Sequence, residues 1–258
     1  MRALILLGLG LLASASALVE VKSGYHQEIG IPTAEWIKAN EEKHLAEVAE
    51  GERIVGGAIA PANAHPYFAG LLISLVGISG NSVCGSTLVS ARSLVTAAHC
   101  WTDGRNQAWQ FLVILGSNQL FTGGTRIATS NVIMHPQYVA STLNNDIAMI
   151  LLPTSIWFSN TIQPISLPSG WDLWDQFVGN WAVAAGFGRT SDQQAGASTI
   201  VSHVNLQVIS VAQWPGCVPA MSSFTRVRSA PTALGVSASV GGDSGGPLVI
   251  SRNGGPPL

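Results

Sequence analysis

The stretch that most constrains this chain is the glycine-rich sequence GGDSGGP at residues 241–247. Glycines on both sides of Ser244 let the backbone adopt positive φ values and approach another molecule closely, and Pro247 ends the turn before the strand-like LVI at 248–250. A serine hydroxyl is an effective nucleophile only beside a base and backbone N–H donors. An ordinary glycine-rich hairpin is the alternative, so a catalytic serine here requires a histidine and a carboxylate elsewhere.

Both required groups are present in strand-like surroundings. His99 lies in TAAHC at 96–100, after an apolar run, and Asp146 lies in NNDIAMI at 144–150, just before another. The three motifs, in the order His, Asp, Ser, closely resemble those of the chymotrypsin/trypsin-like serine proteases. Other hydrolases carry the same groups in other orders, so the order matters. The resemblance extends over about residues 54–249.

The composition and the hydrophobic pattern favour an all-β fold. Only 10% of the 258 residues are charged, 47% are hydrophobic and 28 are glycine, which suits a turn-rich β protein and argues against disorder or a coiled coil. Clusters of Gly, Asn, Pro or Ser separate short apolar or alternating runs at 68–76, 86–90, 111–115, 147–152, 181–185 and 203–209. We find no convincing helical period after Ile54.

The resemblance sharpens this to two antiparallel six-stranded β-barrels, with the active site between them. His99 and Asp146 then belong to the first barrel and Ser244 to the second. Family members extend well beyond the position of Leu258, so the second barrel is expected to be incomplete at the C-terminus.

The resemblance also implies roles in a secreted serine endopeptidase that works through an acyl-enzyme. Ser244 attacks the scissile carbonyl, His99 transfers the proton, and Asp146 orients the imidazole. The backbone N–H groups of Gly242 and Ser244 form the oxyanion hole. Asp103, shortly after His99, is interpreted as a solvated loop residue because it lies in a polar turn beside a glycine.

The N-terminus predicts export. Residues 1–17 combine a basic start, an apolar run and small residues, which is typical of a secretory signal peptide. The apolar run is too short for a membrane anchor. We therefore expect a secreted, extracellular protein with no membrane partner.

The charges mark a processing boundary. All Glu and Lys residues precede Ile54, and the strong charges after it are Asp and Arg alone. We interpret residues 18–53 as a partly helical activation propeptide and residues 54–258 as the protease domain; a simple polar arm is the alternative. The resemblance implies that a trypsin-like protease cuts after Arg53. The new amino group of Ile54 would then pair with Asp243.

The cysteines and histidines indicate a disulfide and no metal site. In an exported chain Cys84 and Cys100 are expected to form a disulfide that tethers the loop of His99, with two free thiols as the alternative. Cys217 is left over. No metal-ligand spacing or phosphate loop occurs, so no metal and no cofactor are predicted. The remaining histidines are interpreted as surface or structural residues: His26, His44, His65, His135 and His203.

Substrate preference and partners follow from the resemblance. Ala238, with Ser239 beside it, stands at the base of the primary specificity pocket, where an acid would select Arg or Lys; Ala238 predicts an apolar, chymotrypsin-like pocket. The expected partners are protein or peptide substrates, the activating protease and protein protease inhibitors, and the chain is expected to be a monomer. A net charge of −2 without basic runs gives no reason to expect nucleic acid.

Two broader interpretations accompany these predictions. Arg keeps its charge at alkaline pH, so a protease domain without Lys or Glu resembles insect digestive chymotrypsins, although compositional drift would give the same pattern. The alternative function is an inactive, truncated homologue with a binding role or no stable function. The intact His99, Asp146 and Ser244 argue against it.

Overall fold

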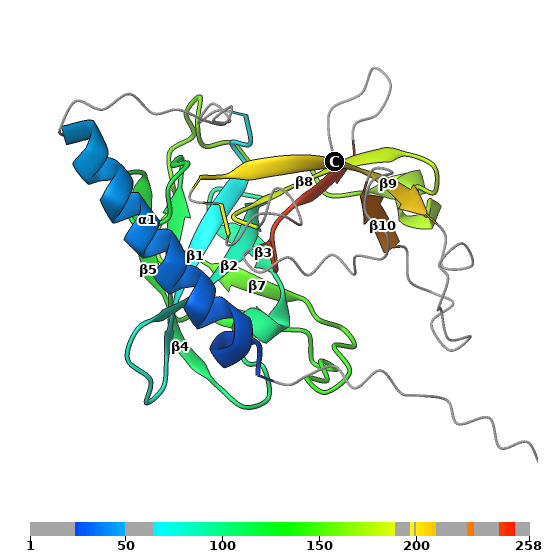
Figure 1. Ribbon diagram of the computed structural model, residues 1–258. Coiled ribbons are helices and arrows are strands. Elements are labelled where there is room, and N and C mark those ends of the chain that lie inside the picture. Colours follow the sequence, from blue (N-terminus) through cyan, green and yellow to red (C-terminus); the bar gives the residue numbers. More distant parts are fainter. Residues whose placement is uncertain are drawn as a thin grey trace, which may run out of the picture.

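Two antiparallel β-sheets form the framework of the described chain (Figure 1). The computed structural model describes residues 24–49, 64–188, 197–198, 200–209, 226–229 and 243–250. After residue 64, the helices in these ranges are the short 3₁₀ segments η2 (Ala98–Cys100) and η3 (Gly170–Trp174). The all-β prediction for the body of the chain is therefore confirmed.

The first sheet closes on itself. Its strands, in the order β5-β4-β1-β2-β3-β7-β6, are β1 (Phe68–Leu75), β2 (Asn81–Leu88), β3 (Ser93–Thr96), β4 (Ala108–Leu115), β5 (Thr125–Thr129), β6 (Val132–Met134) and β7 (Ala148–Leu151). The two edge strands, β5 and β6, are consecutive in the chain, so the sheet must curl until its edges meet. Thr129 Oγ1 donates to the carbonyl of Leu151 (2.7 Å), and the Leu151 N–H donates to the carbonyl of Asn131 (2.9 Å). Counted as one interrupted strand, β5 and β6 give the expected six-stranded barrel.

The second sheet has four strands among the described residues. They follow the order β10-β9-β8-β11, with bounds β8 (Trp181–Gly186), β9 (Ser202–Ile209), β10 (Arg226–Ser229) and β11 (Leu248–Ile250). The LVI run after the glycine-rich turn thus forms the predicted strand, which pairs with β8. The sequence around β10 did not predict a strand; pairing with the regular β9 places one there.

Apolar side chains join the two sheets. Leu71, Ile73 and Phe111 are fully buried inside the first barrel. Phe68 of β1 and Phe187, just after β8, pack edge to face with ring centroids 5.7 Å apart. This contact fixes the second sheet against the first and defines the boundary where the site lies.

The N-terminal segment is folded onto the protein as a helical arm. Residues 24–49, called the N-terminal arm below, contain the π-helical turn η1 (His26–Gly30) and the helix α1 (Ile31–Ala49). The arm lies along β2 (Figure 1), and Ala34 and Ile37 are buried in the cluster that contains Phe68 and Phe187. The described helices include none that is both long and apolar enough to cross a bilayer.

Candidate active site

His99 is held in a rigid position by its own short helix and by a disulfide. It lies in η2, directly after β3, and its neighbour Cys100 is joined to Cys84 of β2. The two Cα atoms are 6.3 Å apart. The side chain of His99 is only 12% exposed. The imidazole therefore has little freedom to turn away from its partners.

Asp146 orients this imidazole. β3 pairs with β7 so that Thr96 faces Ala148, and this register brings the residues just beyond, His99 and Asp146, together. The His99 backbone N–H donates to Asp146 Oδ1 (2.7 Å), and Nδ1 lies 2.6 Å from Oδ2. An ionised carboxylate only accepts hydrogen bonds, so Nδ1 carries the proton and the lone pair is left on Nε2.

The glycine-rich turn brings Ser244 to the same place from the far end of the chain. The Gly85 N–H donates to the Ser244 carbonyl (2.7 Å), and Cys100 Sγ lies 3.9 Å from that oxygen. Gly245 has a φ of +76°, and a Cβ there would lie 2.7 Å from the Gly85 carbonyl. Glycine is thus required both by the backbone conformation and by the close approach.

His99 Nε2 is buried and has no hydrogen-bond partner among the described residues, the Ser244 hydroxyl included. Instead, the phenol ring of Tyr25 in the N-terminal arm lies edge-on to the imidazole, with centroids 4.6 Å apart. The structure thus brings the backbone of Ser244 beside the element of His99, without joining the two side chains by a hydrogen bond.

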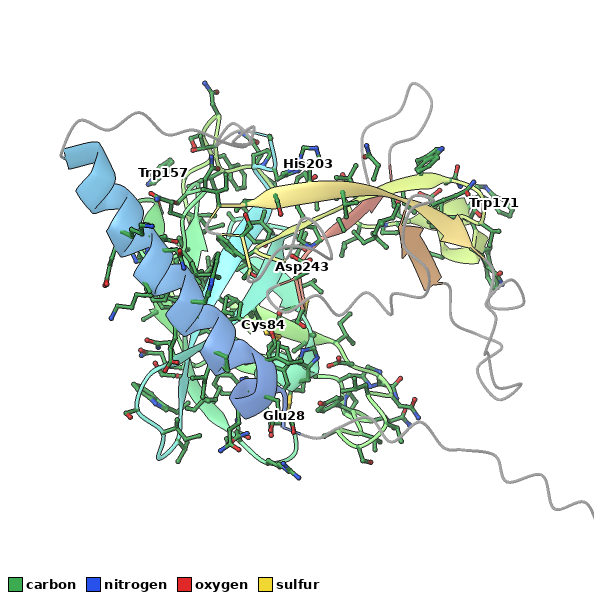
Figure 2. The ribbon with its side chains drawn as sticks, viewed as in Figure 1. Glu28, Cys84, Trp157, Trp171, His203 and Asp243 are labelled. Atoms are coloured by element: carbon green, nitrogen blue, oxygen red, sulfur yellow. A yellow bond between two sulfur atoms is a disulfide. The ribbon has the colours of Figure 1, made fainter. Side chains whose placement is uncertain are left out.

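Asp243, next to Ser244, is a buried acid with a weak set of partners. Its Oδ1 accepts the Gly188 N–H (2.7 Å), and a Cβ on either Gly186 or Gly188 would collide with the carboxylate. Burial raises the pKa of Asp243 to about 6, and the hydrogen bond from Gly188 only partly opposes this. Figure 2 labels Asp243 between the two sheets. Its environment suits a cation that the described residues do not supply.

The expectation that Asp103 is a solvated loop residue is wrong. Asp103 is only 3% exposed. It accepts backbone N–H bonds from His26 (2.9 Å), Arg105 (2.9 Å) and Asn106 (2.7 Å). Burial alone would raise the pKa of Asp103, but these hydrogen bonds together lower it. The acid is buried because the arm covers the turn, which no local feature of that turn indicates.

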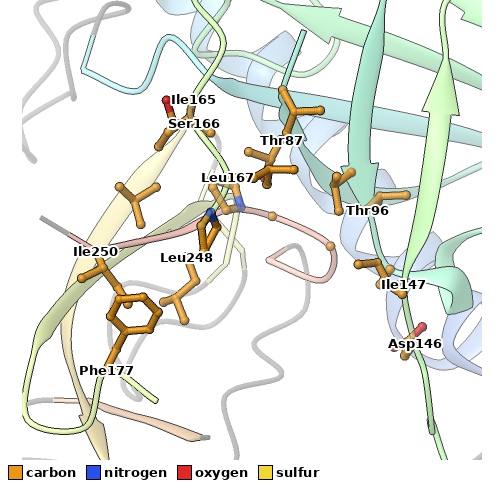
Figure 3. A pocket seen from close by; sticks show the side chains of 18 residues that line it. Thr87, Thr96, Asp146, Ile147, Ile165, Ser166, Leu167, Phe177, Leu248 and Ile250 are labelled. Atoms are coloured by element: carbon orange, nitrogen blue, oxygen red, sulfur yellow. The ribbon is translucent and has the colours of Figure 1, made fainter. Parts of the chain in front are cut away.

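A cleft of about 430 Å³ lies beside the site, between the two sheets (Figure 3). Thr96 of β3 and Asp146, just before β7, line it on one side, with Gly245 of the glycine-rich turn; Phe177 of the loop before β8 and Ile250 of β11 line the other. The lining is mostly apolar. A chain segment bound in this cleft would therefore pass directly beside the His99–Asp146 pair.

The remaining predicted site residues are placed as follows. Cys84, Cys100 and His99 have ligand atoms within 4.8 Å of one another, but the disulfide occupies both sulfurs, so this trio does not bind a metal. The oxyanion, activation and pocket predictions for Gly242, Arg53, Ile54, Ala238 and Ser239 lie outside the described residues, as does Cys217.

Sequence reasoning missed Tyr25 and His26, which approach the site from the N-terminal arm. Tyr25 contacts the ring of His99, and His26 bonds to Asp103. His26 and Asp103 are 77 residues apart in the sequence. The aromatic pair in an otherwise polar segment was the available signal, and it does not say what the pair covers.

Comparison with known proteins gives a consistent result. The family model described as Trypsin matches residues 54–255. Achelase-1 of Lonomia achelous is 33% identical over 210 residues, covering 77% of this chain and 92% of the relative. Trypsin alpha of Drosophila melanogaster is 33% identical, covering 76% of this chain and 73% of the relative.

A solved structure agrees with these sequence matches. An HL collagenase superposes with a TM-score of 0.62 at 31% identity, covering 76% of this chain and 81% of that one. The family match begins at Ile54, so the N-terminal arm lies outside it.

Proposed function

The chain belongs to the trypsin family of serine endopeptidases, and from this premise we propose that it is a secreted zymogen whose His99, Asp146 and Ser244 form a catalytic triad. The observation that carries the proposal is the pair of hydrogen bonds from His99 to Asp146. They fix the tautomer in which Nε2 can accept a proton, on an element that contacts the backbone of Ser244.

The chemistry follows from that tautomer. Ser244 Oγ attacks the scissile carbonyl as Nε2 of His99 takes its proton, and the resulting imidazolium is stabilised by Asp146. The oxyanion forms at the backbone N–H groups of Gly242 and Ser244, a contribution of about 3–4 kcal/mol per donor in comparable enzymes. His99 then protonates the leaving amine, and water repeats the sequence to release the acyl group.

Activation is proposed to occur by cleavage after Arg53. The family match begins at Ile54, the residue that this cut would make N-terminal. Its new amino group would supply the cation that buried Asp243 lacks among the described residues, and would fix the turn that carries Ser244. An ionised carboxylate left unpaired in the interior costs several kcal/mol, so this pairing would favour the active turn.

The substrate class is proposed to be proteins and peptides cleaved after apolar residues, because Ala238 and Ser239 offer no counter-charge for Arg or Lys. The Lys-free, Glu-free composition after Ile54 supports a digestive role at alkaline pH. A pH–activity profile that peaks near neutrality would contradict the alkaline role.

Covalent labelling tests the triad. After trypsin treatment and removal of the N-terminal arm, a serine-directed phosphonate is expected to label Ser244 in the wild-type chain, and Ser244→Ala is expected to abolish labelling. The exposed Ser155→Ala is the matched control and should be labelled like the wild type. Arg53→Gln should stay uncut and unlabelled.

Two results would contradict the proposal. Absence of label in the fully cut wild-type chain after removal of the N-terminal arm would favour the inactive homologue with a binding role. Labelling of a trypsin-treated Arg53→Gln chain would place the activating cut elsewhere.

A further inference from the structure

The first turn of the N-terminal arm contacts His99, the candidate general base. Tyr25 Oη donates to the carbonyl of Val83 (2.8 Å), and its ring lies against the His99 imidazole at an interplanar angle of 66°. Tyr25 Oη is also 3.7 Å from Sγ of Cys84, in the disulfide that holds His99. Figure 2 shows Cys84 beside this end of the arm. The phenol therefore covers the element on which the proposed chemistry depends.

The next residue fixes Tyr25 in place. His26 is fully buried. Its backbone N–H donates to Asp103 Oδ2 (2.9 Å), and its Nδ1 lies 2.9 Å from Ser82 Oγ. Gly30, one turn later, packs so closely on Ser82 that a Cβ would collide with the hydroxyl. These contacts leave the first turn of the arm no room to shift away from His99.

A second anchor holds the far end of the described arm. Glu41 is 1% exposed, and its two carboxylate oxygens accept the N–H groups of Leu120 (2.7 Å) and Phe121 (3.0 Å). Burial raises the pKa of Glu41, and the two hydrogen bonds only partly oppose this. Ala34 and Ile37 between the anchors are buried. The arm is thus docked along its length by specific polar contacts and by apolar packing.

Nε2 of His99 is one of three buried ring nitrogens without a hydrogen-bond partner among the described residues; the other two belong to His26 and His65. A buried polar atom without a partner is destabilising. His99 Nε2 is buried without a partner, with an apolar ring beside it. This arrangement blocks a reactive nitrogen without satisfying it.

We propose that the N-terminal arm is a built-in inhibitor: Tyr25 seals His99, and the arm stays bound after the cut at Arg53 until it dissociates in a separate step. The inference rests on the proposed function, which makes His99 the general base. Arg53 lies beyond α1, and the cut removes none of the contacts of Tyr25, His26 or Glu41 described above. Cleavage and release are therefore two distinct requirements for activity.

The accessibility of His99 tests the seal without using catalysis. The full chain is treated with diethylpyrocarbonate, which modifies accessible neutral imidazoles, and the modification of His99 is followed by mass spectrometry with exposed His203 as internal reference. Tyr25→Ala removes the seal, and Gly30→Ala keeps the phenol but places a Cβ against Ser82 Oγ and 3.1 Å from Cε1 of Tyr25, which pushes the first turn of the arm off the barrel. Both are expected to speed modification of His99 by about tenfold, which corresponds to about 1.4 kcal/mol.

Glu42→Gln is the matched control. Glu42 is an exposed arm residue that pairs with Lys38 at 4.0 Å and does not contact the barrel in any described interaction. His99 in the Glu42→Gln variant should react with diethylpyrocarbonate at the wild-type rate. If Tyr25→Ala fails to fold, Gly30→Ala alone decides the question, because it keeps the phenol and displaces the turn that carries it. Equal reactivity of His99 in the wild type and Gly30→Ala would overturn the seal.

The second step is tested on the wild-type chain after complete cleavage at Arg53. The arm fragment is expected to co-elute with the protease domain in size-exclusion chromatography, and His99 should remain protected. Immediate loss of the arm on cleavage would overturn the separate release step.

Phosphonate labelling separates the failure of this inference from the failure of the proposed function. Labelling of Ser244 at the same rate with the arm bound and removed would refute inhibition while the enzyme assignment stands. No labelling in any form, together with arm-dependent protection of His99, would refute the enzyme assignment and leave the seal in place.

Discussion

At the scale of single residues, Asp243 is the group on which the proposed activation depends. Among the described residues its carboxylate accepts one N–H bond, from Gly188, and burial raises its pKa to about 6. Above that pH the ionised group is poorly compensated. Under the proposed activation, the new amino terminus of Ile54 would compensate that charge.

The stability of the uncut chain should depend on this residue in a defined pH range. Because the folded pKa of about 6 exceeds the ordinary 3.8, the Asp243 contribution to folding is full below pH 3.8 and is lost as the pH rises to about 6. The free energy of unfolding of Asp243→Asn should therefore rise relative to that of the wild type over this range, and the difference should reach about 3 kcal/mol above pH 6. Urea unfolding at pH 4, 6 and 8 measures the gap.

The exposed Asp175→Asn serves as the control for the removal of one carboxylate. In the chain cut at Arg53 the sign should reverse, because Asp243 then pairs with an amino group that asparagine cannot neutralise. A gap that is independent of pH in the uncut chain would contradict the role assigned to Asp243.

At the scale of elements, the arm is docked through a histidine that must stay neutral. Burial, reinforced by the nearby His99, lowers the pKa of His26 to about 4, although Asp103 acts in the opposite direction. Released His26 takes up a proton below about pH 6.5. Docking through His26 therefore weakens as the pH falls from about 6.5 to about 4.

Glu41 opposes this trend. Burial raises its pKa, so docking favours its protonated form and weakens as the pH rises through that pKa. The two residues anchor opposite ends of the described arm, and each can be removed separately. A variant with Glu41→Gln isolates the contribution of His26.

We expect the arm of the cut Glu41→Gln chain to dissociate on acidification. Between pH 7 and pH 4, protonation of His26 should weaken docking by up to about 3 kcal/mol. Co-elution of arm and protease domain at pH 7, 6, 5 and 4 provides the measurement. Adding His26→Gln should remove the pH dependence, and Glu42→Gln is the control for Glu41→Gln. Acid-induced release that persists with His26→Gln would assign the effect to another group.

At the scale of the whole molecule, glycines allow the backbone of the first sheet and the turn of Ser244 to approach each other closely. Gly85 of β2 donates its N–H to the Ser244 carbonyl, and a Cβ at Gly85 would lie 2.8 Å from Gly246 Cα and 3.0 Å from Gly246 N. These are backbone atoms, which cannot rotate away as a side chain can. The distance between the barrel of His99 and the turn of Ser244 is therefore set at Gly85.

Gly85→Ala should separate the two halves. We expect a loss of about 1–3 kcal/mol in the free energy of unfolding, as for overpacking elsewhere in protein cores. Labelling of Ser244 by the phosphonate should slow as well, because the turn moves away from His99. Urea unfolding and labelling rates of the cut chain provide the two readouts, with Ser155→Ala as the control for both. A wild-type free energy of unfolding together with a wild-type labelling rate would contradict the role assigned to Gly85.

Much of this arrangement could be predicted from the sequence. The motifs around His99, Asp146 and Ser244 identified the family, and the apolar runs located most strands of the two sheets. Three described strands were not predicted: β5, β6 and β10. β6 spans only the three residues Val132–Met134, too few to show a period. β5 is exposed or half-buried along most of its length, so TRIAT has little apolar alternation, and β10 is short and polar. Both owe their strand conformation to pairing with a regular neighbour.

The sequence by itself determined the family motifs, their order and the disulfide partners, because short motifs and cysteine chemistry are local. Only the tertiary structure decided that Asp103 is buried and that Tyr25 covers His99. Burial depends on which distant segment covers a residue, and the covering segment here is the N-terminal arm. The burial depends on contacts between distant segments, such as the hydrogen bond from the His26 N–H to Asp103. No local sequence pattern contains such contacts.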